Sequence, residues 1–363
     1  GDEFGIILKN CTRQGAVDTC REIQKQVAET PFHWDDCDYT IGASIGINQI
    51  DRNTRDSADA LRKSGLACYT AKDQGGNNVY IYEEKDSELI RREEETFWAS
   101  RIREAIDHDR IKLFAQPIMS LKDDKRRRDH IEILARLIDE DGLLIAPGAF
   151  IPAAERYNLM HLIDRKVVKE TFRFIHKLGN NSPDAGMTYA INLSGNTLGD
   201  KKFIGYVSEL KERYHINSQR ICFEITETAA IKHLGQAKSL IRELRNLGFK
   251  FALDDFGSGL SSFQYLKNLS VDYLKIDGSF VADMVNNTID HAMVAAINEV
   301  GHIMGIETIA EYVENEQIIK KLQEIQVDYA QGYGVEQPAP LAEIVRSGEN
   351  SPPLKVIKNP SKS

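Results

Sequence analysis

Residues 250–259 read Lys-Phe-Ala-Leu-Asp-Asp-Phe-Gly-Ser-Gly. The run begins as a short apolar strand and ends in Asp254 and Asp255, which two glycines follow closely. Glycine allows positive φ and so permits a tightly turned loop directly after the carboxylates. The stretch therefore predicts a buried strand with a functional loop at its carboxyl end, which is where α/β barrels form their active sites.

Seven similar apolar segments accompany this one along the chain, at residues 111–118, 131–136, 187–193, 221–226, 273–276, 308–311 and 329–332. Longer amphipathic segments separate most of them, at residues 152–178, 203–214, 230–247, 289–304 and 315–325. Repeated strand–helix units predict the α/β class and a TIM-like (β/α)8 barrel. A doubly wound open sheet is the competing architecture, and the number of strand segments favours the barrel.

Polar side chains stand near the ends of these strands, where apolar ones would be expected: Glu132, Asn192, Glu224, Asp254, Asp255, Lys275, Glu311 and Gln331. Carboxylates that converge on one face of a barrel repel, and each close pair costs on the order of a few kcal/mol. Divalent cations would relieve that repulsion, and an all-oxygen ligand set suits Mg²⁺ or Mn²⁺. Two cations that share a carboxylate fit the hydrolysis of a phosphodiester.

Composition excludes several other classes of protein. The formal net charge of −9 argues against binding to long nucleic acid. No apolar run approaches the roughly 20 residues of a membrane-spanning helix, so we expect no membrane insertion by this chain. The five cysteines are odd in number and form no CxxC pair, which predicts reduced thiols in a cytoplasmic protein. Serine-hydrolase and nucleotide-fold motifs are also absent from the sequence.

The first part of the chain has a different pattern of predicted strands and helices. Short strands are predicted at residues 4–8, 39–47 and 79–82, and helices at residues 16–29 and 56–74. Residues 84–107 are highly charged and predict a linker helix. We therefore expect a small domain at 1–83, the linker helix at 84–107, the barrel at 108–346 and a flexible tail at 347–363.

The barrel segment resembles the EAL family of cyclic di-GMP phosphodiesterases over about residues 95–345. The motifs that carry the resemblance are Gln116-Pro-Ile, Glu132-Ile-Leu-Ala-Arg136, Asn192-Leu-Ser, Glu224-Ile-Thr-Glu227, Asp254-Asp-Phe-Gly-Ser-Gly259, Asp272-Tyr-Leu-Lys-Ile-Asp277, Ala310-Glu-Tyr-Val-Glu314 and Gln331-Gly-Tyr with Pro338 after it. The signature triplet departs from the family, because it reads Glu-Ile-Leu where Glu-Ala-Leu is usual. The glutamate of the triplet is kept.

The resemblance implies that two cations, Mg²⁺ or Mn²⁺, bind in each active site. The implied ligands of the first cation are Glu132, Asn192, Glu224 and Asp254. The implied ligands of the second cation are Asp254, Asp255 and Glu311. Lys275 and Glu311 are the implied catalytic residues, with Lys275 beside the attacking water. The implied substrate contacts are Gln116, Leu134, Arg136, Gln331 and Pro338. Glu227, Gly257 and Gly259 are implied to stabilise the loop after Asp254.

The opening of the chain resembles the second half of a GGDEF diguanylate cyclase domain. The matching segments are Gly1-Asp-Glu-Phe4, Ala43-Ser-Ile-Gly-Ile47 and Ala71-Lys-Asp-Gln-Gly-Gly-Asn77. The resemblance implies a partial α+β domain that makes no cyclic di-GMP by itself, and Gly76 stands where the family commonly has arginine.

Together the two resemblances imply hydrolysis of cyclic di-GMP to linear pGpG in bacterial second-messenger signalling, by a homodimer. Two alternatives are open at this point. One is a catalytically silent receptor for cyclic di-GMP. The other is a bifunctional cyclase and phosphodiesterase in a longer parent protein.

Overall fold

The computed structural model describes residues 4–30, 32–34, 37–39, 41–52, 54–73, 76–83, 87–122, 128–140, 142–179, 186–257 and 265–347. The chain divides into two compact units, Gly1–Trp98 and Ala99–Ser363. The boundary falls inside helix α3 (Ser87–Asp107), so this helix contributes residues to both units. The predicted tail begins at the last described residue, and the rest of it lies outside the described residues.

The first unit holds two long helices and two small sheets. Helices α1 (Arg13–Glu29) and α2 (Ser57–Asp73) lie in the predicted positions. Strands β3 (Ile45–Ile47) and β4 (Val79–Ile81) pair in parallel, and β1 (Phe32–Trp34) pairs antiparallel with β2 (Cys37–Tyr39).

The prediction of a strand at residues 4–8 is wrong. Within the described residues β3 and β4 pair only with each other, so residues 4–8 have no neighbouring strand to take up their backbone hydrogen bonds. The predicted strand at residues 39–47 is shorter, because residues 41–44 are irregular.

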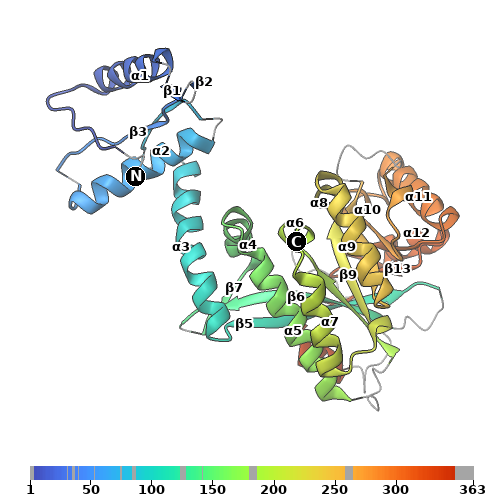
Figure 1. Cartoon of the computed structure of the whole chain (residues 1–363). Coiled ribbons are helices and arrows are strands. Elements are labelled where there is room, and N and C mark those ends of the chain that lie inside the picture. The colour runs from blue at the N-terminus through green and yellow to red at the C-terminus, as the bar shows by residue number, and fades with distance from the viewer. Residues whose placement is uncertain are drawn as a thin grey trace. The chain divides into compact units, whose positions relative to one another are not determined.

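The second unit is a closed barrel (Figure 1). Its eight strands are β5 (Ile111–Ser120), β6 (Arg128–Ile138), β8 (Thr188–Asn192), β9 (Ile221–Thr226), β10 (Lys250–Phe256), β11 (Tyr273–Ile276), β12 (Glu307–Ala310) and β13 (Tyr329–Ala330). Neighbours from β6 to β13 pair in parallel, and β5 closes the ring by pairing with both β6 and β13. The predicted α/β barrel is therefore confirmed.

One strand departs from the expected parallel arrangement. Strand β5 runs antiparallel to both of its neighbours. Only residues 121–127 join it to β6, which is fewer than the dozen or so that a parallel crossover needs. Two short strands that the sequence did not predict, β7 (Leu144–Ile145) and β14 (Ala339–Pro340), extend the sheet beside β6 and β5.

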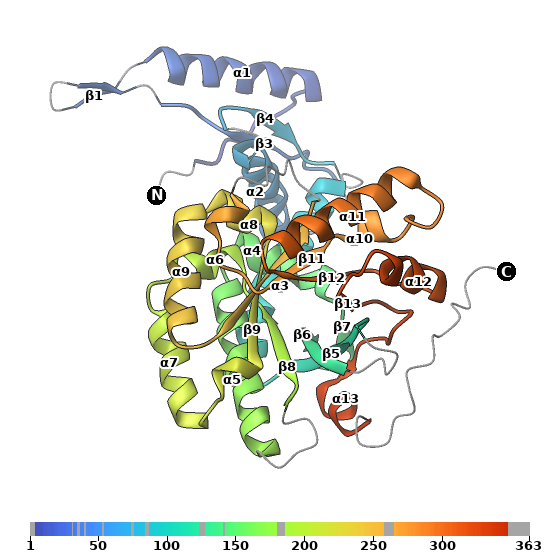
Figure 2. The ribbon, with the colours of Figure 1, turned by 90° about the vertical axis from the view of Figure 1, so that its right-hand side faces the viewer.

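Helices surround the barrel strands (Figure 2). The helices between strands include α7 (Phe203–Tyr214), α11 (Thr288–Ile303) and α12 (Glu316–Glu324), which match the predictions within a residue or two, while α13 (Leu341–Ser347) follows the last strand. The predicted helix at residues 152–178 is instead two helices, α4 (Pro147–Arg156) and α5 (Met160–Leu178). They are separated at Asn158, whose φ of +54° is a left-handed conformation that asparagine tolerates.

The predicted helix at residues 230–247 is also divided. Helix α8 (Glu227–Lys232) is separated from α9 (Leu234–Asn246) by His233, which has a non-helical backbone. Helix α8 and two other short helices, α6 (Gly195–Leu198) and α10 (Gly278–Val281), begin within a few residues of the carboxyl end of a barrel strand. These short helices fix the direction in which the chain leaves the mouth of the barrel.

A single apolar layer fills the lower part of the barrel interior. Its members come from seven different strands: Ile118, Ala190, Cys222, Ala252, Tyr273, Ile309 and Tyr329. The eighth strand contributes His130, whose ring packs against the rings of Tyr273 and Tyr329. We call this layer the apolar floor, and the polar residues at the barrel mouth lie next to it.

No helix within the described residues is both long enough and apolar enough to cross a bilayer.

Candidate active site

The polar cluster at the barrel mouth follows from strand alternation. Side chains two residues apart along a strand point to the same face, so the position two residues beyond each member of the apolar floor also faces the barrel axis. Those positions are Gln116 on the reversed strand β5, Glu132, Asn192, Glu224, Asp254, Lys275, Glu311 and Gln331. All eight strands therefore direct a polar side chain into one layer above the floor.

Lys275 lies at the centre of this layer. Its Nζ atom is 2.8 Å from Oε1 of Glu311, 2.9 Å from Oδ1 of Asp254, 3.2 Å from Oε2 of Glu224 and 3.4 Å from Oε2 of Glu132. The lysine side chain is only 1% exposed. One buried cation thus holds carboxylates from four strands together.

Glu132 receives hydrogen bonds from amide side chains on both sides. Asn192 Nδ2 donates to Oε1 of Glu132 at 2.6 Å, and Gln331 Nε2 donates to Oε2 at 2.6 Å. Gln331 Nε2 also donates to Oε1 of Gln116 at 3.3 Å. The Nε2 atom of Gln116 in turn donates to the backbone oxygen of Glu336 at 3.0 Å. The amide groups orient the carboxylate and bring Gln116 into the same network.

Two consecutive aspartates reach the site because β10 is irregular at its end. Side chains of adjacent strand residues normally point to opposite faces. The register between β10 and β11 shifts between Leu253 and Phe256, and Asp255 adopts a φ of +55°. Asp254, Asp255 and Glu311 each place a carboxylate oxygen within 4.8 Å of the other two.

The negative charge of the cluster exceeds what Lys275 can balance. Burial raises the pKa of Glu224 well above its usual value, and the neighbouring carboxylates add to the rise although Lys275 opposes it. Burial likewise raises the pKa of Glu311 to about 8 and that of Asp255 to about 6. For Glu132, burial is outweighed by Lys275 and the two amide donors, so its pKa is lowered.

The pKa of Lys275 itself is held well above its usual value. Burial would lower it, but the surrounding carboxylates outweigh burial, with Asp254 first among them. Lys275 is therefore a fixed positive charge among these side chains.

The donor set fits hard divalent cations. Carboxylate oxygens dominate the cluster, and the amide oxygen of Asn192 is available because its nitrogen makes the bond to Glu132. Oxygen-only sets of this kind suit Mg²⁺ and Mn²⁺. The group formed by Asp254, Asp255 and Glu311 can hold one ion, and the excess of buried carboxylates explains why positive charge would be favourable there.

The other predicted substrate contacts lie along the rim of this layer. Leu134 and Arg136 follow Glu132 on β6, toward the barrel mouth. The guanidinium of Arg136 lies over the ring of Phe114, and burial lowers the pKa of Arg136, which Tyr333 and Glu132 partly oppose. Pro338 directly precedes β14, which pairs with β5 beside Gln116. These residues share the mouth with the cluster, and their contact with substrate stays a prediction.

Glu227 holds the segment that follows the paired aspartates. Its Oε2 accepts a hydrogen bond from the backbone nitrogen of Gly257 at 2.9 Å, and its Oε1 accepts one from the hydroxyl of Tyr265. Sequence reasoning named Glu227 and Gly257 but missed Tyr265, although it lies only eight residues beyond Gly257. Gly259, the third predicted loop residue, lies outside the described residues.

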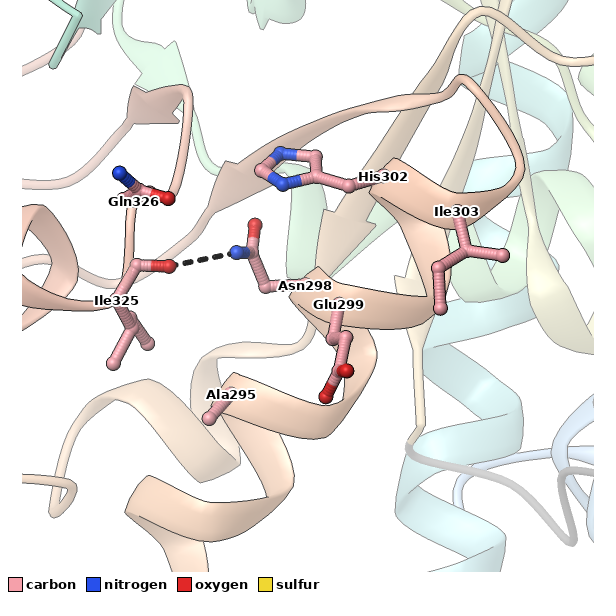
Figure 3. A pocket seen from close by; sticks show the side chains of 7 residues that line it. All are labelled: Ala295, Asn298, Glu299, His302, Ile303, Ile325 and Gln326. Carbon is pink, nitrogen blue, oxygen red and sulfur yellow. Dashed lines mark hydrogen bonds between the residues drawn. The ribbon is translucent and has the colours of Figure 1, made fainter.

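A separate cavity lies away from this cluster. It has a volume of about 530 Å³ and lies against α11 and the turn after α12 (Figure 3). Asn298 donates a hydrogen bond to the backbone oxygen of Ile325 across it, and His302 pairs with Asp328 nearby. None of its lining residues belongs to the acidic cluster.

Comparison with protein families gives two matches. A model described as "EAL domain" matches residues 99–338. A model described as "Diguanylate cyclase, GGDEF domain" matches residues 1–78.

Curated relatives match over most of this chain. The cyclic di-GMP phosphodiesterase PdeB of Shewanella oneidensis is 41% identical over 342 residues, which is 94% of this chain and 40% of the relative. The cyclic di-GMP phosphodiesterase PdeF of Escherichia coli is 36% identical over 250 residues, which is 69% of this chain and 33% of the relative. This chain therefore spans less than half the length of these two relatives.

Solved structures match the barrel. The FimX EAL domain of Pseudomonas aeruginosa bound to c-di-GMP aligns with a TM-score of 0.62 and 26% identity, over 67% of this chain and 96% of that one. The PaMucR phosphodiesterase in complex with c-di-GMP aligns with a TM-score of 0.64 and 26% identity, over 68% of this chain and 99% of that one. Both relatives were solved with the same small dinucleotide bound.

Proposed function

This chain belongs to the EAL domain family, and on that premise we propose that it hydrolyses one phosphodiester bond of cyclic di-GMP to give linear pGpG. The relatives named above as cyclic di-GMP phosphodiesterases support this substrate, as do two structural neighbours solved with c-di-GMP. The observation that carries the proposal is the complete ring of carboxylates around Lys275 at the barrel mouth.

The residues of the ring divide into two proposed cation sites. Glu132, Asn192, Glu224 and Asp254 would hold the first cation, and Asp254, Asp255 and Glu311 would hold the second. Bound Mg²⁺ or Mn²⁺ would supply a water of lowered pKa and neutralise phosphate oxygens. Asp254 would belong to both sites. Its Oδ1 atom contacts Lys275, which also contacts Glu132 and Glu224. One of its carboxylate oxygens lies within 4.8 Å of Asp255 and Glu311.

Lys275 and Glu311 are the proposed catalytic residues. Lys275 carries a fixed positive charge, so its Nζ atom would donate to the attacking water or to a phosphate oxygen whose charge grows during the reaction. Glu311 lies 2.8 Å from Nζ and would hold the lysine in that orientation while binding a cation.

The rim residues would position the dinucleotide. Arg136 is half-buried and can bind a phosphate through its planar guanidinium. The Oε1 atom of Gln331 is buried and has no hydrogen-bond partner among the described residues, so it is available to a donor on the substrate. Gln116, Leu134 and Pro338 complete the proposed contacts. Glu227 and Gly257 would keep Asp254 and Asp255 in register with the bond to be broken.

We also expect the chain to form a homodimer, as the family resemblance implies. The outer side of α11 supports this expectation, because Ile289, Met293 and Ile303 are 71%, 41% and 78% exposed. Light scattering of the purified chain tests it, and a monomer at every concentration would contradict it. The cytoplasmic location and the absence of binding to long nucleic acid stay predictions from the sequence.

The direct test is to incubate the purified chain with cyclic di-GMP and either Mg²⁺ or Mn²⁺, and to separate the products by chromatography. The proposal expects pGpG, whose formation stops when EDTA is added. The receptor alternative expects binding of cyclic di-GMP without any product. Glu132→Ala and Asp254→Ala should each abolish turnover, and full activity in both variants would contradict the assignment of the ligands.

A further inference from the structure

Tyr312 has an unusual backbone for its residue type. Its φ is +52°, and the other described non-glycine residues with positive φ are Asn10, Asn77, Asp109, Asn158, His215, Asp255 and Gln326. Asparagine and aspartate enter this left-handed region readily, whereas for a bulky side chain it costs about 1–2 kcal/mol. A conformation of that cost persists only where the surrounding structure imposes it. Tyr312 directly follows Glu311, the proposed ligand and catalytic residue.

The ring of Tyr312 sits on a glycine of the neighbouring strand–helix connection. A Cβ atom placed on Gly278 would lie 2.1 Å from Cδ2 and 2.5 Å from Cγ of the ring, so only glycine fits beneath it. Gly278 opens helix α10, whose N-cap is Asp277 at the end of β11. The ring therefore joins the end of β12 to the end of β11, which carries Lys275.

The peptide around Tyr312 is held on its other side as well. The backbone nitrogen of Glu311 donates to Ile276 at 3.2 Å, and that of Val313 donates to Gln331 at 2.9 Å. Gly332 also comes so close that a Cβ atom there would lie 2.3 Å from the nitrogen of Val313. The backbone from Glu311 to Val313 is thus fixed between β11 and the residues after β13.

We infer that Tyr312 is a positioning residue for Glu311: its ring, seated on Gly278, fixes the left-handed peptide that aims the Glu311 carboxylate at Lys275, Asp254 and Asp255. This inference rests on the proposed function only where it treats Glu311 as a cation ligand. Tyr312 is 68% exposed, and its hydroxyl group makes no hydrogen bond within the described part of the chain, so the ring itself carries the effect.

The first test compares Mn²⁺ binding to the metal-free chain, measured by calorimetry, in Tyr312→Gly and Tyr312→Phe. Glycine removes the ring and accepts positive φ without strain, so the melting temperature should stay within a few degrees of the original. Mn²⁺ affinity and kcat should nevertheless fall about tenfold or more, as for other residues that orient a ligand, with KM for cyclic di-GMP little changed. Phenylalanine keeps the ring and should restore Mn²⁺ affinity.

A second variant tests the same contact from the other side. Gly278→Ala would displace the ring of Tyr312, because the added Cβ atom would overlap it, and should weaken Mn²⁺ binding in the same way. In the Tyr312→Gly background the ring is gone, so Gly278→Ala should add almost nothing, and the two changes should be strongly non-additive. His215→Gly is the matched control, because His215 is also left-handed but ends α7 just before the amino end of β9, whereas the cluster lies at the carboxyl ends of the strands.

Three results would overturn the inference. The first is unchanged Mn²⁺ affinity in a folded Tyr312→Gly or Gly278→Ala chain. The second is a rise in KM alone, which would mean that the ring touches substrate instead of positioning Glu311. The third is full additivity of the two changes. If the unaltered chain binds Mn²⁺ but forms no pGpG, the proposed function fails while the binding test of Tyr312 still decides this inference.

Discussion

The Nζ atom of Lys275 lies 2.8 Å from Oε1 of Glu311, and both side chains are almost wholly enclosed by the barrel. The pair joins neighbouring strands β11 and β12 at their carboxyl ends. Around it, buried carboxylates outnumber the single lysine, and the pKa of Glu311 rises to about 8. Near neutral pH the folded chain therefore keeps protons on some of these carboxylates, and bound cations would take the place of those protons.

Glu311→Gln tests whether activity requires the carboxylate of Glu311 itself or only an intact strand β12. Replacing the carboxylate that would bind a cation with a neutral amide should lower kcat by about two orders of magnitude or more. Glu307→Gln is the matched control, because Glu307 lies at the opposite end of β12 and pairs with Lys122 near the surface. Steady-state kinetics should show nearly unchanged turnover for the control. Equal losses in both variants would mean that β12, and not the carboxylate of Glu311, determines activity.

Cation binding should increase the free energy of unfolding of the chain. Mn²⁺ at about one hundred times its dissociation constant should stabilise the chain by about 3 kcal/mol and raise the melting temperature by a few degrees. Glu224→Gln should raise the melting temperature of the metal-free chain, because Glu224 is buried beside like charges. The same variant should lose much of the Mn²⁺ effect. A metal-free melting temperature that falls in Glu224→Gln would contradict this view of the cluster.

The strands and their polar ends could be predicted from the sequence because both signals are local. An apolar run of strand length marks a buried strand, and a charged residue near its end stands out by type. Lys275 and Glu224 were found in this way. The direction of β5 was missed because a pattern of apolar residues reads the same in either direction, and only the short connection through residues 121–127 excludes a parallel crossover.

Features that depend on one residue's backbone or on distant partners could not be predicted. Asn158 divides a segment whose apolar spacing continues through it, and its left-handed φ has no periodic signal. Tyr265 reaches Glu227 across 38 positions of sequence, so only the fold reveals the pair. Tyr312 lies within a recognisable motif, yet its contact with Gly278 depends on how β11 and β12 end.

Asp164 should make stability depend on pH. Its Oδ2 accepts hydrogen bonds from the nitrogen and hydroxyl of Ser194 and from Thr197, but burial raises its pKa from 3.8 to about 6. Between those values the folded chain binds a proton that the unfolded chain does not, so this group's contribution to stability falls as pH rises and is lowest above about 6. The change should amount to about 3 kcal/mol.

Asp164→Asn removes this titration while keeping an oxygen that can accept hydrogen bonds. Urea unfolding at about pH 4.5 and about pH 7 should show that the variant gains stability relative to the unaltered chain at the higher pH. A difference between the two chains that is the same at both pH values would show that Asp164 does not titrate in this range.

The hydrogen bond from Tyr265 to Glu227 should contribute more to stability than an ordinary tyrosine bond. Its acceptor is a fully buried carboxylate, so Tyr265→Phe should cost about 1.5–3 kcal/mol of unfolding free energy. Tyr206 donates to the neutral backbone oxygen of Arg165 at 2.9 Å, so Tyr206→Phe should cost only about 1 kcal/mol. Chemical denaturation of both variants measures the difference, and a smaller loss for Tyr265→Phe would contradict the assignment.

The central claim is that the carboxylates around Lys275 form a cation-dependent phosphodiesterase site. The most direct measurement is the conversion of cyclic di-GMP by the purified chain with Mn²⁺, with Mg²⁺ and then with EDTA. We predict linear pGpG with either cation and none after EDTA. Binding of cyclic di-GMP with no product under any cation, or product formation that EDTA leaves unchanged, would contradict the claim.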